Sequence, residues 1–192
     1  MTESPSGPPP VPPPVPSGAT GLRRSFGERV LGALKLDASV YDEVEHDADA
    51  LPQAAGVIAL AAVAAALGSF AIGGGRAVLG AVVSSFVGWF LSAGIVWGIG
   101  VKAMGHSSNY PELLRTLGFA SAPQILLVLG ILPLGPLRFV LSLGVLVLTL
   151  VAFVVAVRQA LDVSTGRAVG VCLLAVLAWG VLGMVCGGVA AM

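Results

Sequence analysis

Charged residues divide this chain into five long apolar runs, and this spacing limits its fold more than any other feature. The uncharged runs lie between Asp49 and Arg76, Arg76 and Lys102, Arg115 and Arg138, Arg138 and Arg158, and after Arg167. Each run is close to the ~20 residues that an α-helix needs to cross ~30 Å of hydrocarbon. Only 10% of the residues are charged, against about 25% in soluble domains. The sequence therefore predicts an all-α membrane protein with a bundle of five transmembrane helices.

The predicted transmembrane domain covers residues 51–192, with spans at about 53–72, 78–100, 113–132, 137–157 and 168–190. Glycine and proline mark the shortest connections: "GGGR" is expected to make a tight turn at Arg76, and "PLGP" at 133–136 turns the chain into the fourth span. Pro123 is expected to kink the third span, where Ser121 or Gln124 can satisfy the carbonyl that the proline frees.

Two segments precede the first span. Residues 1–20 hold eight of the 13 prolines and are predicted to be an extended, disordered tail, either a solvated tether or a docking peptide. Residues 21–50 are predicted to form a short cytoplasmic helical segment. Its first part has amphipathic spacing typical of a helix that lies flat in the headgroup region. Asp37 or Ser39 then caps a second helix, from which Val40 and Val44 reach toward the membrane.

The stretch before the first span is acidic. It contains His46 together with five carboxylates, at Asp42, Glu43, Glu45, Asp47 and Asp49. One interpretation is a divalent-cation or partner site, and the other is a solvated helix face that ends in a cap for the first span. The second is favoured because the spacing matches no known metal-binding loop. No cofactor is expected.

The distribution of Lys and Arg predicts the orientation in the membrane. One side of the predicted topology carries eight of the ten, four before the first span, two around the second loop and two at Arg158 and Arg167. The other side carries only Arg76 and Arg138. We therefore expect a plasma (inner) membrane protein with a cytoplasmic N-terminus and an external C-terminus. The net charge of zero argues against a nucleic-acid partner.

Small residues recur every fourth position in the second span, at Gly80, Ser84, Gly88 and Ser92, and again in the fifth, at Gly183 and Gly187. Such stripes allow close helix packing, either inside the bundle or between two copies of the chain. Ser92 is disfavoured as a nucleophile because its nearest base, His106, lies past the end of the span. No Asp, Glu, Lys, Arg or His lies in the middle of a span, so Gln124 is the strongest polar candidate for a transport path.

The stretch "VRQALDVSTGRAV" is a polar turn between the last two spans. Arg158 and Asp162 are four residues apart and can pair if the helix continues into the cytosol. Arg158 and Arg167 are placed to contact lipid phosphates. This interpretation involves no catalysis.

With these stretches in view, the chain resembles the Yip1 family of five-span membrane proteins, and its bacterial branch in particular. The resemblance is carried by "LDASVYDEVEHDADALPQA", "LLRTLGFASAP" and "VRQALDVSTGRAV". Gly118, Phe119 and Pro123 resemble the family's Gly-Tyr-x-x-x-Pro pattern, with phenylalanine in place of tyrosine. The family's Asp-Leu-x-Gly-Pro motif is matched only by an aspartate, Leu51 and Pro52. The resemblance implies a cytoplasmic N-terminal segment followed by five helices.

The leading functional hypothesis is a non-enzymatic membrane scaffold or adaptor, or a lipid organiser, because no catalytic group is evident and polar residues gather on one side. Its partners would be the lipid bilayer and an unknown membrane or cytoplasmic protein, with homo-oligomers as a further option. The alternative is a small-solute transporter or channel, which requires a continuous polar path past Gln124 or the serines of the second span.

Overall fold

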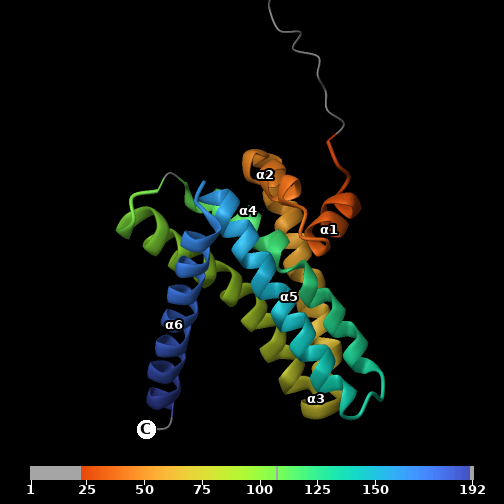
Figure 1. The fold of residues 1–192 in the computed structure, drawn as a ribbon. Helices are drawn as coiled ribbons and strands as arrows, with labels where there is room; N and C mark the ends of the chain where they lie inside the picture. The colour runs from red at the N-terminus through yellow and green to blue at the C-terminus, as the bar shows by residue number, and fades with distance from the viewer. Residues whose placement is uncertain (1–22, 107, 191–192) are drawn as a thin grey trace, which may run out of the picture.

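The computed structural model describes residues 23–106 and 108–190, except for the side chains of 69–74, 76–77 and 181–190. All regular structure in the described residues is helical, and they contain no strand (Figure 1). The predicted all-α fold is confirmed for this part of the chain. The predicted proline-rich tail lies outside the described residues. The same holds for the side chain of Arg76 and for the packing around Gly183 and Gly187.

The first two predicted spans form one helix, α3 (Leu51–Trp97), which continues as a π-helix, η2 (Gly98–Ala103). Ile58 and Gly88 line the same cavity, although a straight helix would hold them about 45 Å apart. The chain therefore bends back within α3, whose yellow middle lies at the end of the molecule farthest from α2 (Figure 1). The tight turn predicted at Arg76 is corrected, because the backbone stays helical there, and clustered glycines permit the bend.

The third predicted span changes its helix type at Pro123. It consists of α4 (Tyr110–Ala120) followed by a 3₁₀-helix, η3 (Ala122–Ile131). The chain thus changes near Pro123 to a longer, narrower helical form, because proline at the start of η3 has no N–H for an α-helical bond; the kink at Pro123 stays a prediction. Ser121 Oγ donates to the carbonyl of Leu117 at 3.0 Å, as a buried hydroxyl next to a helix end requires.

The last two predicted spans are α5 (Leu137–Ala160) and α6 (Thr165–Ala190). Four helical segments in the described residues are long and apolar enough to cross a membrane, namely Ala48–Gly68, Val78–Ala103, Tyr110–Ile131 and Leu137–Ala160. Thr165–Gly180 is a shorter apolar helix, so the fifth span stays a prediction. Large apolar side chains such as Phe139, which is 73% exposed, face outward and fit a lipid environment.

Two short helices cover one end of this bundle. They are α1 (Phe26–Leu34) and α2 (Ala38–His46), and a single 3₁₀ turn, η1 (Ala48–Ala50), joins α2 to α3. We call this end, formed by α1, α2 and the first turns of α3 and α4, the polar end. Val40 and Val44 are buried in the protein core, not directed into lipid as predicted. The far end of α6 lies opposite the polar end (Figure 1).

Candidate functional site

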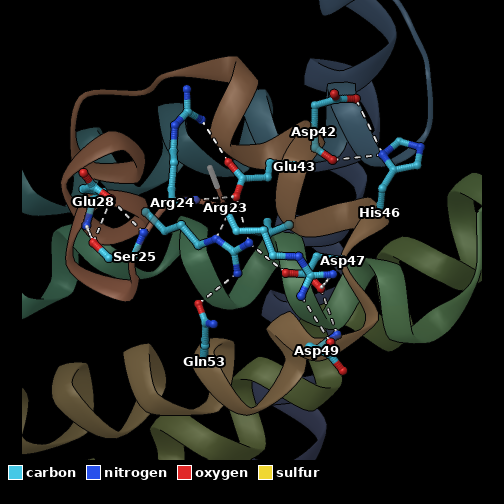
Figure 2. A network of polar contacts seen from close by, with 12 residues as sticks. Arg23, Arg24, Ser25, Glu28, Asp42, Glu43, His46, Asp47, Asp49 and Gln53 are labelled. Atoms are coloured by element: carbon cyan, nitrogen blue, oxygen red, sulfur yellow. Dashed lines mark hydrogen bonds and ion pairs between the residues drawn. The ribbon is translucent and has the colours of Figure 1, made fainter. Parts of the chain in front are cut away.

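A buried arginine organises the polar end. Arg29 is 1% exposed, and its guanidinium donates to the carboxylates of Glu43 and Asp47 at 2.7 Å and to the Gln53 amide oxygen at 3.0 Å. Figure 2 shows Glu43, Asp47 and Gln53 converging from α2 and the start of α3. A buried charge is tolerated only when it is paired and hydrogen-bonded in this way. Arg29 therefore joins three helices that the sequence presents separately.

The ion pair between Arg29 and Asp47 determines the direction in which the pKa of each group is shifted. Burial acts to raise the pKa of Asp47, but hydrogen bonds from Arg29 and the Asp49 amide outweigh it, so the pKa lies below its ordinary value. Burial likewise acts to lower the pKa of Arg29, and its bonds with Asp47 and Glu43 reverse that effect. Both groups are charged at neutral pH. The acidic stretch was expected to be a solvated face, and for Asp47 that expectation is corrected.

Local sequence fixes α1 and α2 around this pair. Ser25 and Glu28 form a reciprocal capping box at the start of α1. Asp37 caps α2 by accepting the amide of Ser39 at 3.0 Å, as predicted. The hydroxyl of buried Tyr41 donates to the Ala33 carbonyl and ties the two helices together.

Arg23, which is exposed, and Arg24, which is partly buried, complete the ion pairs at the margin of the polar end. Arg24 reaches Glu43 at 3.3 Å, and Arg23 lies 3.3 Å from Asp47 and 3.2 Å from Asp49 (Figure 2). Surface pairs of this kind contribute at most about 1 kcal/mol each. These arginines lie beside the Arg29 pair, and Glu43 forms ion pairs with both Arg24 and Arg29.

A second arginine locks α2 onto the bundle. Arg115, on α4, is 8% exposed and donates through Nε to the Val44 carbonyl at 3.1 Å and through Nη2 to the Glu45 carbonyl. It thus satisfies carbonyls in the last turn of α2, which have no intrahelical partner. In the sequence, Arg115 served only in the count of charges that predicts the orientation in the membrane. The sequence gives no signal for its contact with α2, because the two segments are roughly seventy residues apart.

The other face of α2 carries a different group of residues. Ligand atoms of Asp42, Glu45 and His46 all lie within 4.8 Å of one another, and Figure 2 shows Asp42 beside His46, apart from the arginines. Burial is the main cause that raises the pKa of Glu45 to about 7; nearby His46 opposes it, and Asp162, Glu112 and Asp42 reinforce it. The structure therefore brings Asp162, from the turn after α5, to the acidic segment.

The remaining residues of that turn behave differently from the prediction. Arg158 donates to the Gln159 side chain at 3.1 Å and forms no ion pair with Asp162 in the described part of the chain, because α5 ends at Ala160 and Asp162 adopts a positive φ of 49°. Arg167 is exposed, in keeping with the predicted place at the membrane surface.

The residues of the Gly-Tyr-x-x-x-Pro pattern lie at the contact of α3 with α4. A Cβ added to Gly118 would lie 2.7 Å from the Ala54 Cβ, so the two backbones touch. Phe119 is fully buried. Pro123 begins η3. This pattern therefore serves helix packing and the change of helix type.

The stripe of Gly80, Ser84, Gly88 and Ser92 is not pressed against another helix in the described residues. A Cβ at Gly80 or Gly88 would meet nothing within 4 Å, which corrects the predicted close packing inside the bundle. Ser92 accepts a hydrogen bond from Trp179 at 3.1 Å. The stripe instead borders a cavity of about 150 Å³, where Ser84, Ser85 and Ser92 meet Ser121 and Gln124.

Ser92 and His106 are not brought together. Eleven helical residues, 93–103, lie between them along α3 and η2, which corresponds to about 16 Å. The structure supplies no nucleophile and base pair at this point in the described chain.

Comparison with known proteins yields one match. The family model of the Yip1 domain matches residues 45–187, from the last turn of α2 to near the end of α6. No curated protein and no solved structure matches the chain. The matched region contains the Gly118 contact, the Arg115 lock and the long apolar helices. The resemblance seen in the sequence is thereby confirmed, and this membrane protein belongs to the Yip1 family.

Proposed function

We propose that the protein is a non-enzymatic membrane scaffold or adaptor that presents its polar end to a protein partner. The observation that carries the proposal is the buried Arg29 pair, which joins α1, α2 and α3. A segment held in this way is a preformed surface, and binding to it costs little ordering entropy. A flexible recruiting tail would not require a buried charge.

The Arg115 contact supports the same proposal. It connects α2 to α4 inside the bundle, so a partner that binds α2 contacts a surface continuous with the membrane domain. The short turn between α5 and α6 adds Asp162 to that surface, and the first turn of α6 adds Arg167. Recognition would therefore use residues from three parts of the chain, and the N-terminal segment alone would not reproduce it.

We further propose that the polar end faces the cytoplasm and that the protein resides in the plasma membrane. Eight of its ten Lys and Arg residues lie on the proposed cytoplasmic side. A tag fused after Met192 should be accessible to protease from outside intact spheroplasts. Protection of that tag would contradict the orientation.

Photocrosslinking of the full-length chain in native membranes tests the scaffold role. Photoreactive residues placed at Lys35 and at Arg167, both exposed, should give the same protein adduct by mass spectrometry. Phe139 lies at the other end of α5 and is the matched control, which should give lipid adducts only. Absence of a protein adduct from both Lys35 and Arg167 would contradict an adaptor function.

A second candidate function is the passage of a small solute. The observation in its favour is the cavity of about 150 Å³ that gathers Ser84, Ser85, Ser121 and Gln124 between apolar helices. If the cavity belongs to a path, flux of small polar solutes into proteoliposomes should disappear on Gln124→Leu. Equal flux in the wild type and in protein-free liposomes would exclude this function.

A further inference from the structure

Three of the apolar helical segments meet around one basic residue at the end of the bundle opposite the polar end. Ala48–Gly68 and Tyr110–Ile131 end there, and Leu137–Ala160 begins there, one residue before Arg138. Arg138 lies about 33 Å along α5 from Ala160. Figure 1 shows the connection from η3 to α5 at the end of the molecule away from α2. Arg138 is therefore placed where the hydrocarbon of a membrane gives way to lipid headgroups.

A cavity of about 150 Å³ lies beside this residue. It is lined by Arg138, by Ser142 and by five small or apolar residues of α3, η3 and α5. The half-buried guanidinium of Arg138 donates from Nη2 to the carbonyl of Gly68. Gly130 lies against it as well, since a Cβ added there would be 3.8 Å from Nη2. The guanidinium is thus held against two backbone segments at the edge of the cavity, and most of its five N–H groups remain available.

The positive charge of Arg138 has no carboxylate partner in the described chain. No Asp or Glu occurs between Asp49 and Glu112 or between Glu112 and Asp162, and these three acids lie at or beside the polar end. Arg29, by contrast, is held by two carboxylates. A cation that lies against hydrocarbon without a counterion is costly. The charge of Arg138 therefore requires an anion that this part of the protein does not supply.

Ser142 provides a second donor at the same cavity. It follows Arg138 by four residues, so a helix places the two side chains on one face of α5. Ser142 is exposed, and its hydroxyl has no hydrogen-bond partner within the described ranges. Thr149 on the same helix differs, because its hydroxyl donates to the Val145 carbonyl at 2.8 Å. A guanidinium and a free hydroxyl on one face are suited to bind an oxyanion.

We propose that Arg138 and Ser142 bind the phosphate group of an anionic phospholipid from the membrane leaflet at that end of the bundle. Guanidinium and phosphate form two parallel hydrogen bonds, and the phosphate supplies the missing negative charge. An apolar groove lined by Val140, Leu143 and Val147 begins two residues after Arg138 and follows α5 toward the polar end, so it can accommodate an acyl chain. This groove favours a lipid over a soluble phosphate ion. The proposal is independent of the scaffold role.

Lipid binding to the full-length protein provides the test. The protein is purified in detergent, freed of lipid and titrated with phosphatidylglycerol, phosphatidylcholine or inorganic phosphate. Native mass spectrometry measures the bound lipid, and melting in detergent measures the stabilisation. We expect phosphatidylglycerol to bind and to raise the melting temperature more than phosphatidylcholine, whose choline cation opposes Arg138. Equal binding of the two lipids, or displacement of phosphatidylglycerol by an equal concentration of inorganic phosphate, would overturn the proposal.

Variants locate the site. Arg138→Met should weaken the binding of phosphatidylglycerol at least about tenfold, as loss of charge-assisted hydrogen bonds does. Arg23→Met is the matched control, because it removes the same charge from a residue that already pairs with Asp47 and Asp49, and it should bind lipid as the wild type does. Unchanged affinity in Arg138→Met, or an equal loss in Arg23→Met, would overturn the assignment to Arg138.

Two milder variants test the site without removing the charge. Ser142→Ala changes an exposed side chain in a helix, so the fold is expected to persist, and it should weaken binding about three- to tenfold. Arg138→Lys keeps the charge but replaces the forked donor with a single ammonium group, so it should also lose affinity. These variants decide the matter if Arg138→Met is not monodisperse. Wild-type affinity in both of them would overturn the proposal.

Discussion

The Cα hydrogen face of Gly118 lies directly against Ala54, so closely that a Cβ at position 118 would approach the Ala54 Cβ to 2.7 Å and its Cα to 3.2 Å. This contact sets the distance between α3 and α4 at the polar end. Backbone atoms of Ala54 cannot rotate away as the tip of a long side chain can. Helices without a hydrophobic driving force between them depend on such close approaches.

Gly118→Ala should therefore destabilise the protein by about 1–3 kcal/mol, the range expected for an added methyl group in a packed core. Gly144→Ala is the matched control, since Gly144 lies within α5 and a Cβ there meets nothing within 4 Å. That change should be neutral or slightly stabilising. The measurement is the loss of monodisperse protein on heating in detergent. Equal melting temperatures for the two variants would contradict the contact.

Arg29→Met should be the most damaging single change at the polar end. It leaves Asp47 buried without its counterion, and breaking a buried pair costs about 3–5 kcal/mol. Arg23→Met removes an arginine that is 67% exposed and should cost at most about 1 kcal/mol. Limited proteolysis between α1 and α2 reports the difference. Resistance of Arg29→Met to cleavage, equal to that of the wild type, would show that the pair does not hold this segment.

The spans were predictable from sequence because the cost of placing charge in hydrocarbon is a local property of composition. The uncharged runs from Asp49 to Arg76, from Arg76 to Lys102, from Arg115 to Arg138 and from Arg138 to Arg158 each contain most of one of the four helical segments that are long and apolar enough to cross a membrane. Caps were predictable for the same reason, as Asp37 shows, because a capping carboxylate acts within one turn of its own helix. The resemblance to the Yip1 family added the expected order along the chain, with an N-terminal segment followed by the helices.

Burial of charged residues was not predictable in this way. The sequence does not indicate that Arg29 is buried, and only the packing of α1 against α2 shows that Glu43 and Asp47 surround it. Arg115 meets its carbonyl acceptors about seventy residues away in sequence. The form of α3 at "GGGR" depends on how its two halves pack, since glycine permits either a turn or a helical bend. Local patterns carry no information on such contacts.

Arg115→Met should loosen α2 without unfolding the bundle. Hydrogen bonds from a charged donor contribute roughly 1.5–3 kcal/mol, so amides in the last turn of α2 should exchange about 10- to 100-fold faster with solvent deuterium. Amides of α5 should keep their protection. Arg167→Gln is the control, because Arg167 is exposed and lies in the first turn of α6. Unchanged exchange in α2 would contradict the role of Arg115 as its lock.

Asp37 gives the polar end a dependence on acid pH. Hydrogen bonds from the Ser39 hydroxyl and amide, with a smaller contribution from Arg24, hold the pKa of Asp37 below its ordinary value despite a slight opposing effect of burial. Because the folded-state pKa is lower than the unfolded one, the stabilisation is complete above the unfolded value near pH 4 and is lost as pH falls through the folded value. Asp37→Ala should cost about 1 kcal/mol at pH 7, as loss of an N-cap does.

That deficit should shrink as the pH falls below about 4 and through the folded-state pKa of Asp37, because the wild type then loses its charged cap and the alanine variant has none to lose. Asp37→Asn keeps an oxygen acceptor without the titrating charge. It should retain most of the stability at pH 7 and show a flatter decline in melting temperature on acidification. If the wild type and Asp37→Asn decline in parallel, the Asp37 carboxylate contributes nothing to the acid sensitivity of α2, and the ion pairs around Arg29 must account for it.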